Sequence, residues 1–424
     1  MRWKDHPRGV LIALLAIHVL AHIDRNMLLG FSPQITGELA LTNAQYGFLT
    51  GAVWVLSFGV MAVFMGTLAD RYSRTRVMAA GILIWSVCTA ASGAAQSFGQ
   101  MVAARFLVAS GEAALVPAAV SLLAELFAAS RRGGAVGVFF MGIPLGIGFS
   151  FLLAGTIGAT QGWRSTFVLL GAVGVVIALP LLLLPDRRGA GDGAGEAKPG
   201  APFARQVRDV LATLRATPAV AWTIVGFVLV HMAFAGLSFA QLWLVRERGF
   251  DAAGIARQIG ALQLAFGALG SVAGGVLSDR VAHRIKGGHA GFLVALVLLC
   301  GPLMIAYRLV PAGSALFYAG MCAGFFLPLA TYGPANALIQ GLTPDRMRST
   351  VTGLTMMLIN IVAIAIGNLA VGAVSDRLAS AGSGDSLTVV LLATDVLAIA
   401  SAAFFALAAR GPRVQHTPRA VVAH

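Results

Sequence analysis

Long runs of apolar residues alternate with short polar clusters along the whole chain. Each run has roughly the 20 residues that an α-helix needs to cross the hydrocarbon of a bilayer. The runs fall into two sets of six, and together they predict an all-α membrane protein with 12 transmembrane helices in two six-helix bundles. They cover residues 10–32, 44–69, 77–97, 100–127, 134–160, 164–185, 218–245, 252–278, 290–310, 314–340, 347–375 and 386–409.

A polar interval separates the two sets of runs. Its first part is rich in Gly, Ala and Pro, which is typical of a flexible linker. Its second part, 205–216, places Val and Leu on one helical face and Arg elsewhere, which predicts an amphipathic helix on the membrane surface. The predicted organisation is a bundle over 1–185, a cytoplasmic linker over 186–217, a bundle over 218–409 and a cytoplasmic tail over 410–424.

Composition and charge support the prediction of a membrane protein. The chain is 58% hydrophobic and 11% charged, unlike a soluble domain. Its net charge of +13 could suggest nucleic acid, but the basic residues cluster between the runs, so no nucleic-acid partner is expected. With the N-terminus inside, 22 of the 30 basic residues lie on the cytoplasmic side and 6 on the other. Both termini are therefore predicted to be cytoplasmic, in the inner membrane if the source is bacterial.

A charged motif repeats at equivalent places in the two sets. GTLADRYSRTR follows the second run and GVLSDRVAHRIK follows the eighth, which indicates a duplicated transporter. A third copy, GAVSDR at 372–377, falls on the opposite side of the membrane and is predicted to be a helix end without latch function. The residues of the two equivalent copies are Gly66, Asp70, Arg71, Arg74 and Arg76, then Gly275, Asp279 and Arg280.

This loop pattern resembles the signature of the major facilitator superfamily, and the resemblance covers essentially the whole chain. It implies two pseudo-symmetric six-helix bundles that work by alternating access, with the two loops latching the cytoplasmic ends of the bundles. It also implies a monomer within the lipid bilayer.

Charged residues inside the first and fourth runs narrow the resemblance to one branch of the superfamily. Asp24-Arg25, Arg105 with Glu112, Glu125-Leu126-Phe127 and Ile143-Pro144-Leu145-Gly146 look like the spinster-like branch, whose members handle lysophospholipids and phosphorylated sphingoid bases. Proton symporters of organic anions such as hexuronates and sialic acids share the first two of these features.

The same charges are the candidate site. Arg105 and Glu112 are seven positions apart and so share a helical face. A buried carboxylate beside arginines can titrate, so Asp24 and Glu112 are predicted to couple transport to protons. Arg25 and Arg105 are predicted to be their charge partners, one of them also holding an anionic headgroup. The alternative is a static ion-pair network that only fixes helix packing.

The second set of runs offers polar rather than charged candidates. His231, Tyr332, Asn336 and Asn360 are plausible cavity contacts, as is His22 in the first set, but helix–helix hydrogen bonding explains each equally well. Asp395 is an isolated acid without an assigned role. One charged half and one apolar half would suit an amphiphile whose headgroup lies at the N-terminal cluster.

The expected function is therefore proton-coupled transport of an amphipathic anionic lipid or another small molecule, with the proton gradient as energy source and no cofactor. An organic-anion symporter, a drug/proton antiporter and a non-transporting membrane sensor remain alternatives. No Ser/His/Asp set, metal-ligand spacing or phosphate-binding loop occurs in the chain, so neither an enzyme nor a metal site is predicted.

Overall fold

The computed structural model describes residues 6–183, 203–344 and 347–411. Within these ranges twelve helices, some of them interrupted, are long and apolar enough to cross a membrane. They begin and end within a few residues of most of the predicted runs, so the predicted all-α architecture is confirmed. The predicted linker before residue 203 and the tail after residue 411 lie outside the described residues, as do the side chains of Gly66, Asp70 and Arg71.

The first six spans are built from eleven helical segments. Hydroxyl side chains start several of them, since Ser73 and Ser97 each accept a backbone N–H of the first helical turn. The segments are α1 (Pro7–Gly30), α2 (Ser32–Glu38), α3 (Asn43–Gly47), the π-helical turn η2 (Phe48–Ala52), α4 (Val53–Arg71), α5 (Arg74–Gly93), α6 (Phe98–Glu112), α7 (Leu115–Leu126), α8 (Ala129–Phe140), α9 (Gly142–Gly155) and α10 (Ile157–Leu183).

The last six spans follow the amphipathic helix α11 (Phe203–Ala216), which confirms the helix predicted over 205–216. Two of these spans again contain π-helical turns. The segments are α12 (Pro218–Val230), α13 (Met232–Arg246), α14 (Ala252–Leu262), η3 (Gln263–Gly267), α15 (Ala268–Val281), α16 (Gly288–Leu309), α17 (Ala315–Ala330), α18 (Tyr332–Leu342), α19 (Arg348–Leu358), η5 (Ile359–Ile366), α20 (Gly367–Ser380) and α21 (Ser386–Ala409).

Contacts divide the chain into two compact units that do not follow the two sets of six spans. Segments of the seventh, eighth, eleventh and twelfth spans belong with the N-terminal helices. In the eighth span α14 and η3 pack on α9, and in the eleventh α20 packs on α3 and η2. Of the described residues, unit 1 holds 6–183, 234–268 and 364–392, and unit 2 holds 203–233, 269–344, 347–363 and 393–411.

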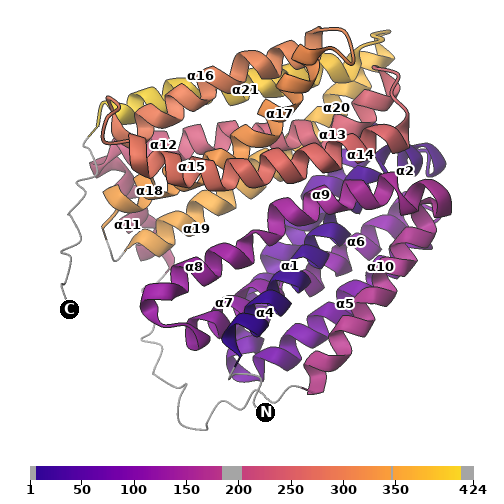
Figure 1. Ribbon diagram of the computed structural model, residues 1–424, viewed down its shortest axis with the longest axis horizontal. Helices are drawn as coiled ribbons and strands as arrows, with labels where there is room; N and C mark the ends of the chain where they lie inside the picture. Colours follow the sequence, from indigo (N-terminus) through magenta and orange to yellow (C-terminus); the bar gives the residue numbers. More distant parts are fainter. Residues whose placement is uncertain (1–5, 184–202, 345–346, 412–424) are drawn as a thin grey trace. The chain divides into compact units, whose positions relative to one another are not determined.

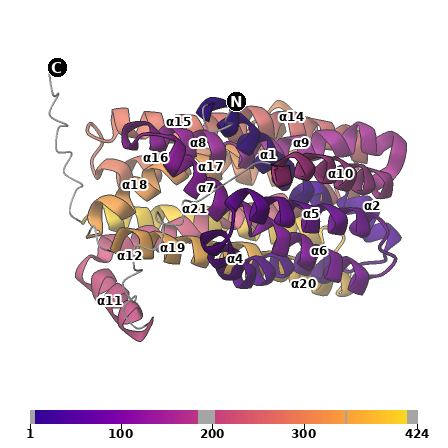
Figure 2. The same ribbon diagram turned by 90° about the horizontal axis from the view of Figure 1, so that it is seen from below.

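Each unit has its own apolar core. In unit 1, α1, α5, α6, α9 and α10 run side by side (Figure 1), and the fully buried Trp85, Phe139 and Phe167 fill the space between neighbouring helices. In unit 2, α16 packs on α17 and α18 (Figure 2), and Phe227 and Phe405 lie in its core. Large exposed apolar side chains such as Leu299 and Val176 suit surfaces that face lipid.

The end of unit 1 at which α1 ends and α3 begins is called here the distal face, and the opposite end, at which α4 ends, the proximal face. Glu38 at the distal face accepts hydrogen bonds from Trp163 Nε1 at 2.6 Å and from Arg164 Nε at 2.8 Å. These two contacts hold the pKa of the Glu38 carboxyl below its usual range. They connect the start of α10 to the segment that joins α2 to α3.

Glycines set the closest approaches between helices. A Cβ on Gly81 of α5 would lie 2.6 Å from the carbonyl oxygen of Gly111 on α6, and a Cβ on Gly111 would lie 2.5 Å from the carbonyl oxygen of Gly81. Neither helix can therefore carry a larger residue here without moving away, and close backbone approach is a main source of helix association in membranes.

We expect Gly81→Ala to lower the apparent melting temperature of the detergent-solubilised protein by several degrees, because forcing a methyl group into a filled contact costs about 1–3 kcal/mol. Gly99→Ala is the matched control, since Gly99 also lies in a helix and a Cβ there meets open space. Equal melting temperatures for the two variants would show that the α5–α6 contact is not limiting.

Candidate functional site

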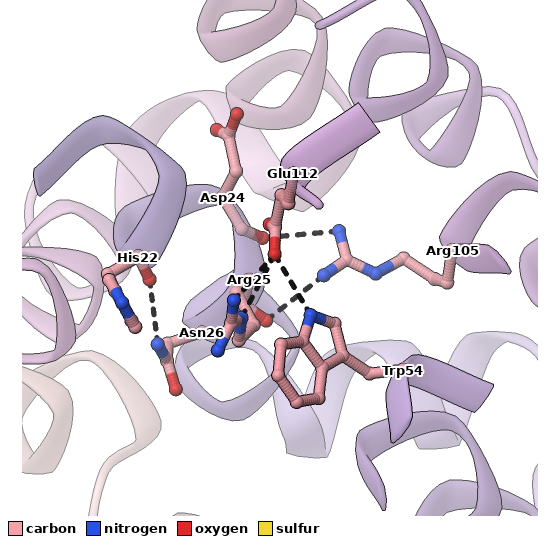
Figure 3. A network of polar contacts seen from close by, with 7 residues as sticks. All are labelled: His22, Asp24, Arg25, Asn26, Trp54, Arg105 and Glu112. Carbon is pink, nitrogen blue, oxygen red and sulfur yellow. Dashed lines mark hydrogen bonds and ion pairs between the residues drawn. The ribbon is translucent and has the colours of Figure 1, made fainter. Parts of the chain in front are cut away.

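The candidate site is formed by three helices of unit 1. Helix α1 carries Asp24 and Arg25 on its second half, α6 carries Arg105 and Glu112, and the first turn of α4 contributes Trp54 (Figure 3). Trp54 was not among the residues predicted from the sequence.

Arg25 and Glu112 form an ion pair, which is one of the pairings that a cluster of two acids and two arginines allows. Arg25 donates to Glu112 Oε2 from Nη2 at 2.7 Å and from Nε at 3.1 Å. Trp54 Nε1 donates to the same oxygen at 2.9 Å, and the Arg25 guanidinium lies 3.8 Å from the centre of the Trp54 ring. The Glu112 side chain is only 2% exposed, but that of Arg25 is 26% exposed. One face of the pair is thus closed by protein, and the arginine remains partly accessible.

Arg105 makes different contacts from those expected. It donates to the main-chain oxygens of Asp24 at 3.2 Å and of Arg25 at 3.1 Å, and it forms no ion pair with either candidate carboxylate (Figure 3). The predicted ionic cluster of two acids and two arginines is therefore only partly formed. Because its guanidinium holds the backbone of α1 at the site, Arg105 fixes the position from which Arg25 and Asp24 project.

The carboxylate of Asp24 points away from the Arg25–Glu112 pair (Figure 3). This follows from helix geometry, because adjacent residues project about 100° apart. Both Asp24 oxygens are buried and form no hydrogen bond with any described residue. Trp85 Nε1 and Thr89 Oγ1 of α5 lie close to it, and both are buried and unpaired as well. Asp24 therefore faces α5 rather than the Arg25–Glu112 pair.

The two histidines of α1 lie against glycines of α9. A Cβ on Gly142 would lie 2.7 Å from His18 Nδ1, and a Cβ on Gly146 would lie 2.3 Å from the Cβ of His22. His18 Nδ1 is also 2.8 Å from the carbonyl oxygen of Phe139. The histidines thus occupy a close helix contact, and the Ile-Pro-Leu-Gly segment gives the space for it. Within the described ranges no group of three metal-ligating side chains is found.

The polar candidates of unit 2 hydrogen-bond to the main chain. His231 is fully buried, with Nδ1 2.6 Å from the carbonyl oxygen of Phe227, and its ring packs on Phe227 and Tyr332. Asn336 and Asn360 each donate to a carbonyl oxygen one turn earlier, at 2.9 Å. All three bonds run to a carbonyl four residues earlier in the same span and leave the amide oxygens of both asparagines available.

Asp395 is not isolated, which corrects the interpretation from sequence. Its Oδ2 accepts from Arg308 Nε of α16 at 2.7 Å, and both side chains are nearly fully buried. The sequence did not indicate this pair because Arg308 stands at the end of its span, where it was counted as a residue of the membrane surface. Unit 2 thus has a buried ion pair of its own, between α16 and α21.

Comparisons with known proteins decide the family. Residues 14–368 match the sequence profile described as Major Facilitator Superfamily. The chain belongs to this superfamily. It is a transporter and not an enzyme, and it is a multi-pass integral membrane protein.

Relatives and structures refine the comparison. An "MFS-type efflux pump" of Mycolicibacterium smegmatis is 29% identical over 370 residues, which are 86% of this chain and 83% of the relative. "Protein spinster" of Drosophila melanogaster is 26% identical over 379 residues, which are 86% of this chain and 61% of the relative. The crystal structure of a bacterial homolog of the human lysosomal transporter Spinster, inward-facing and unoccupied, has a TM-score of 0.81 at 24% identity and covers 96% of this chain and 97% of that chain. The predicted resemblance to spinster is confirmed.

Some residues of the two repeated loops have contacts that the structure describes. Arg74, at the start of α5, is buried and forms an ion pair with Glu125 of α7, and it also donates to Ser121 Oγ at 3.2 Å. Arg76 is exposed. In the second copy of the motif, Asp279 and Arg280 are exposed at the end of α15, and no ion pair of either with another described residue is found.

The positions of Trp54 and Trp85 along their spans could have indicated from the sequence that these residues belong to a polar site. Tryptophan is usual at the two interfaces of a membrane, where its ring lies among the headgroups. Both tryptophans instead fall near the middle of a span, the first within 43–71 and the second within Arg74–Gly93. A mid-span tryptophan has an N–H that must be satisfied inside the protein, which indicates a nearby acceptor.

Trp54→Phe tests the indole contact, because phenylalanine keeps a ring beneath Arg25 and removes the donor to Glu112. We expect substrate uptake by the purified transporter to fall about tenfold, since a hydrogen bond to a charged group contributes about 1.5–3 kcal/mol. Trp54→Leu, which also removes the ring, should reduce uptake further. Trp222→Phe is the control, because Trp222 is exposed on α12 and packs only on Phe404 in its ring contacts. Unchanged uptake by Trp54→Phe would exclude a role for the indole N–H.

Proposed function

We propose that the transporter is a proton-coupled secondary active transporter that works by alternating access and moves an amphipathic anionic, lipid-like substrate of the lysophospholipid or phosphorylated sphingoid type. The observation that carries the proposal is the Arg25–Glu112 pair, in which a partly exposed guanidinium is held by a buried carboxylate.

This pair can couple an anion to a proton. While Glu112 is ionised, its carboxylate occupies Arg25 at 2.7 Å, and an incoming phosphate or carboxylate must compete with it. When a proton binds to Glu112, its negative charge is lost and Arg25 is left with an unmatched charge in a membrane-spanning segment, which is costly. An anionic headgroup then restores the charge balance. Proton and anion therefore favour each other's binding, and this coupling is reciprocal.

Asp24 is proposed as the second proton-binding group. An ionised carboxylate that is buried without a hydrogen-bond donor carries a large desolvation cost, and Asp24 has no such donor among the described residues. Protonation removes this cost, whereas ionisation would favour an inward turn of the Trp85 and Thr89 donors. Glu112 would then sense the substrate and Asp24 the packing of α1 on α5.

The proposed substrate class follows from the distribution of charge. The described site has one partly exposed cation, Arg25, while the corresponding candidates of unit 2 are a histidine, a tyrosine and two amides. One anionic group can be matched at Arg25, and an apolar tail needs no polar partner elsewhere. This choice is supported by the likeness to protein spinster of Drosophila melanogaster and to the bacterial spinster homolog of known structure.

A second candidate is export of amphipathic drugs by proton antiport. It is supported by the name of the mycobacterial relative, an efflux pump that matches 86% of this chain. Cationic drugs would interact with the Trp54 ring and the two acids rather than with Arg25, so the charge of the preferred ligand distinguishes the two candidates.

In proteoliposomes, a pH gradient of one direction, inward or outward, should accelerate substrate transport by the wild type. We expect Glu112→Gln and Asp24→Asn to lose this acceleration while substrate counterflow without a gradient persists, because an amide cannot take up the proton. Asp385→Asn is the control, since Asp385 is an exposed acid in the loop between α20 and α21. Wild-type acceleration in both site variants would contradict the coupling role.

Competition separates the substrate classes. With a fluorescent lysophospholipid as probe, we expect excess lysophospholipid to displace it, a hexuronate to have little effect, and displacement to strengthen as pH falls because proton and anion bind together. Glu112→Gln should bind with a weaker dependence on pH. Displacement by hexuronate alone would favour an organic-anion symporter, and displacement by cationic drugs alone would favour the efflux candidate.

A further inference from the structure

The third copy of the repeated motif lies at the end of α20, at the distal face. It reads Gly-Ala-Val-Ser-Asp-Arg over 372–377, and it shares Gly, Ser, Asp and Arg with Gly-Val-Leu-Ser-Asp-Arg over 275–280 at the end of α15. Nothing in the proposed coupling mechanism uses this copy. From the sequence it was predicted to be a helix end without latch function.

The carboxylate of Asp376 binds the first residues of the second span. Oδ1 accepts the backbone N–H of Asn43 at 3.0 Å, and Oδ2 accepts that of Ala44 at 2.8 Å. The helix that starts here continues without a break through η2 and α4 to Arg71. Its first N–H groups have no partner within the helix, and its N-terminus carries partial positive charge. A carboxylate is the matching group.

The local cap leaves room for this contact. Thr42 accepts the N–H of Gln45 at 3.1 Å, and the Gln45 side chain accepts the N–H of Thr42 at 3.0 Å, which together form a capping box. The box satisfies the third N–H of the helix but not the first two. Asp376 satisfies those two from a segment more than 330 residues away, so the start of the helix is completed only when α20 is docked.

Glycines bring the two helices together along the same contact. A Cβ on Gly372 would lie 2.1 Å from the carbonyl oxygen of Asn43, and one on Gly47 would lie 2.2 Å from that of Asn368. A Cβ on Gly51 would meet the carbonyl oxygen of Ile364 at 2.4 Å. The two backbones therefore touch from the distal face to the middle of the span, and Asp376 stands at the outer end of the contact.

Side-chain hydrogen bonds strengthen the distal end of the contact between α20 and the second span. Asn43 Nδ2 donates to Ser375 Oγ at 3.1 Å, and Arg246 of α13 donates to Asn43 Oδ1 at 3.0 Å. Further in, Asn368 donates to Thr50 Oγ1 and to Ser238 Oγ, both at 3.1 Å. Asn43 is thus bound by its main chain and by both ends of its amide, which makes it the centre of the docked contact.

We infer that the third motif is a second latch, which closes the distal face by holding the end of α20 on the start of the second span, and that Asp376 is its positioning residue. The inference rests on the alternating-access transport proposed above, since a carrier that opens to the distal side must undo this contact. The repeated motif would then act at both faces, with Asp376 engaged when the distal side is closed.

The test measures the latch directly in the substrate-free transporter. Cys88, Cys300 and Cys322 are replaced by Ala, and spin labels are attached at Gln34→Cys on α2 and Ala379→Cys on α20, both exposed positions near the contact. Distances between the labels are then measured by pulsed electron paramagnetic resonance in lipid nanodiscs. The parent protein should show mainly a short distance.

Asp376→Asn should lower the ratio of short-distance to long-distance populations about tenfold, because one of two charge-assisted hydrogen bonds is lost and the other weakened. Asp376→Glu, which keeps the charge, should shift the ratio less. Asp385→Asn, which removes an exposed charge at the same face, should leave it unchanged. Gly372→Val provides an independent variant that wedges the helices apart without altering any charge.

The inference would be overturned if Asp376→Asn and Gly372→Val both kept the short distance of the parent protein. It would also be overturned if Asp385→Asn shifted the populations as much as Asp376→Asn does. Because no substrate or proton gradient enters the measurement, this outcome is distinct from failure of the proposed function. A transporter with a different substrate, or with a different coupling ion, would still show the distal latch.

Discussion

A charge within a membrane-spanning helix must be matched inside the protein, because the hydrocarbon offers no partner. This constraint organises the structure. Arg25 is matched by Glu112, Arg308 by Asp395, and Arg105 by two main-chain oxygens of α1. Asp24 is the exception among these groups, since its carboxylate has no hydrogen-bonding partner in the described part of the chain. A group left unmatched at such cost is best explained by a state in which it carries no charge, and a transporter can use the change between the two states.

Much of the fold could be predicted from sequence because spans need only length, apolarity and charged boundaries. The twelve spans and the amphipathic helix 205–216 followed from these signals. The charges inside two spans indicated a polar cluster, but not which arginine pairs with which acid. What could not be predicted depends on rotation and depth between helices that are distant in sequence. Spacing alone does not show that Arg105 reaches a backbone, that Asp24 turns to α5, or that Asp395 finds Arg308. The contact of Asp376 could not be predicted for the same reason, since its partner is a helix end and not a side chain.

Glycine and carboxylate have complementary tasks in these contacts. Glycine allows a close helix approach, as at Gly142 against the His18 side chain and Gly372 against the Asn43 main chain, but it contributes no direction. A carboxylate that caps a helix end depends strongly on distance and orientation, and therefore selects one docked arrangement among those that glycine permits. Glu247 repeats this arrangement at the start of α21, where it accepts the N–H groups of Leu387 and Thr388 at 2.7 and 2.8 Å. The distal face is thus held by contacts that are strong when formed and can be lost as a whole.

Four spans of the second set each contribute residues to both compact units. The seventh span changes from unit 2 to unit 1 just after its interruption at His231, the eighth changes from unit 1 to unit 2 just after η3, and the eleventh changes from unit 2 to unit 1 inside η5. At such turns the regular i to i−4 hydrogen bonds are already replaced, so a helix can bend there without breaking further bonds. The twelfth span differs, because it changes units inside the continuous helix α21. Three of the four spans therefore have a point of local flexibility at the place where their packing partners change.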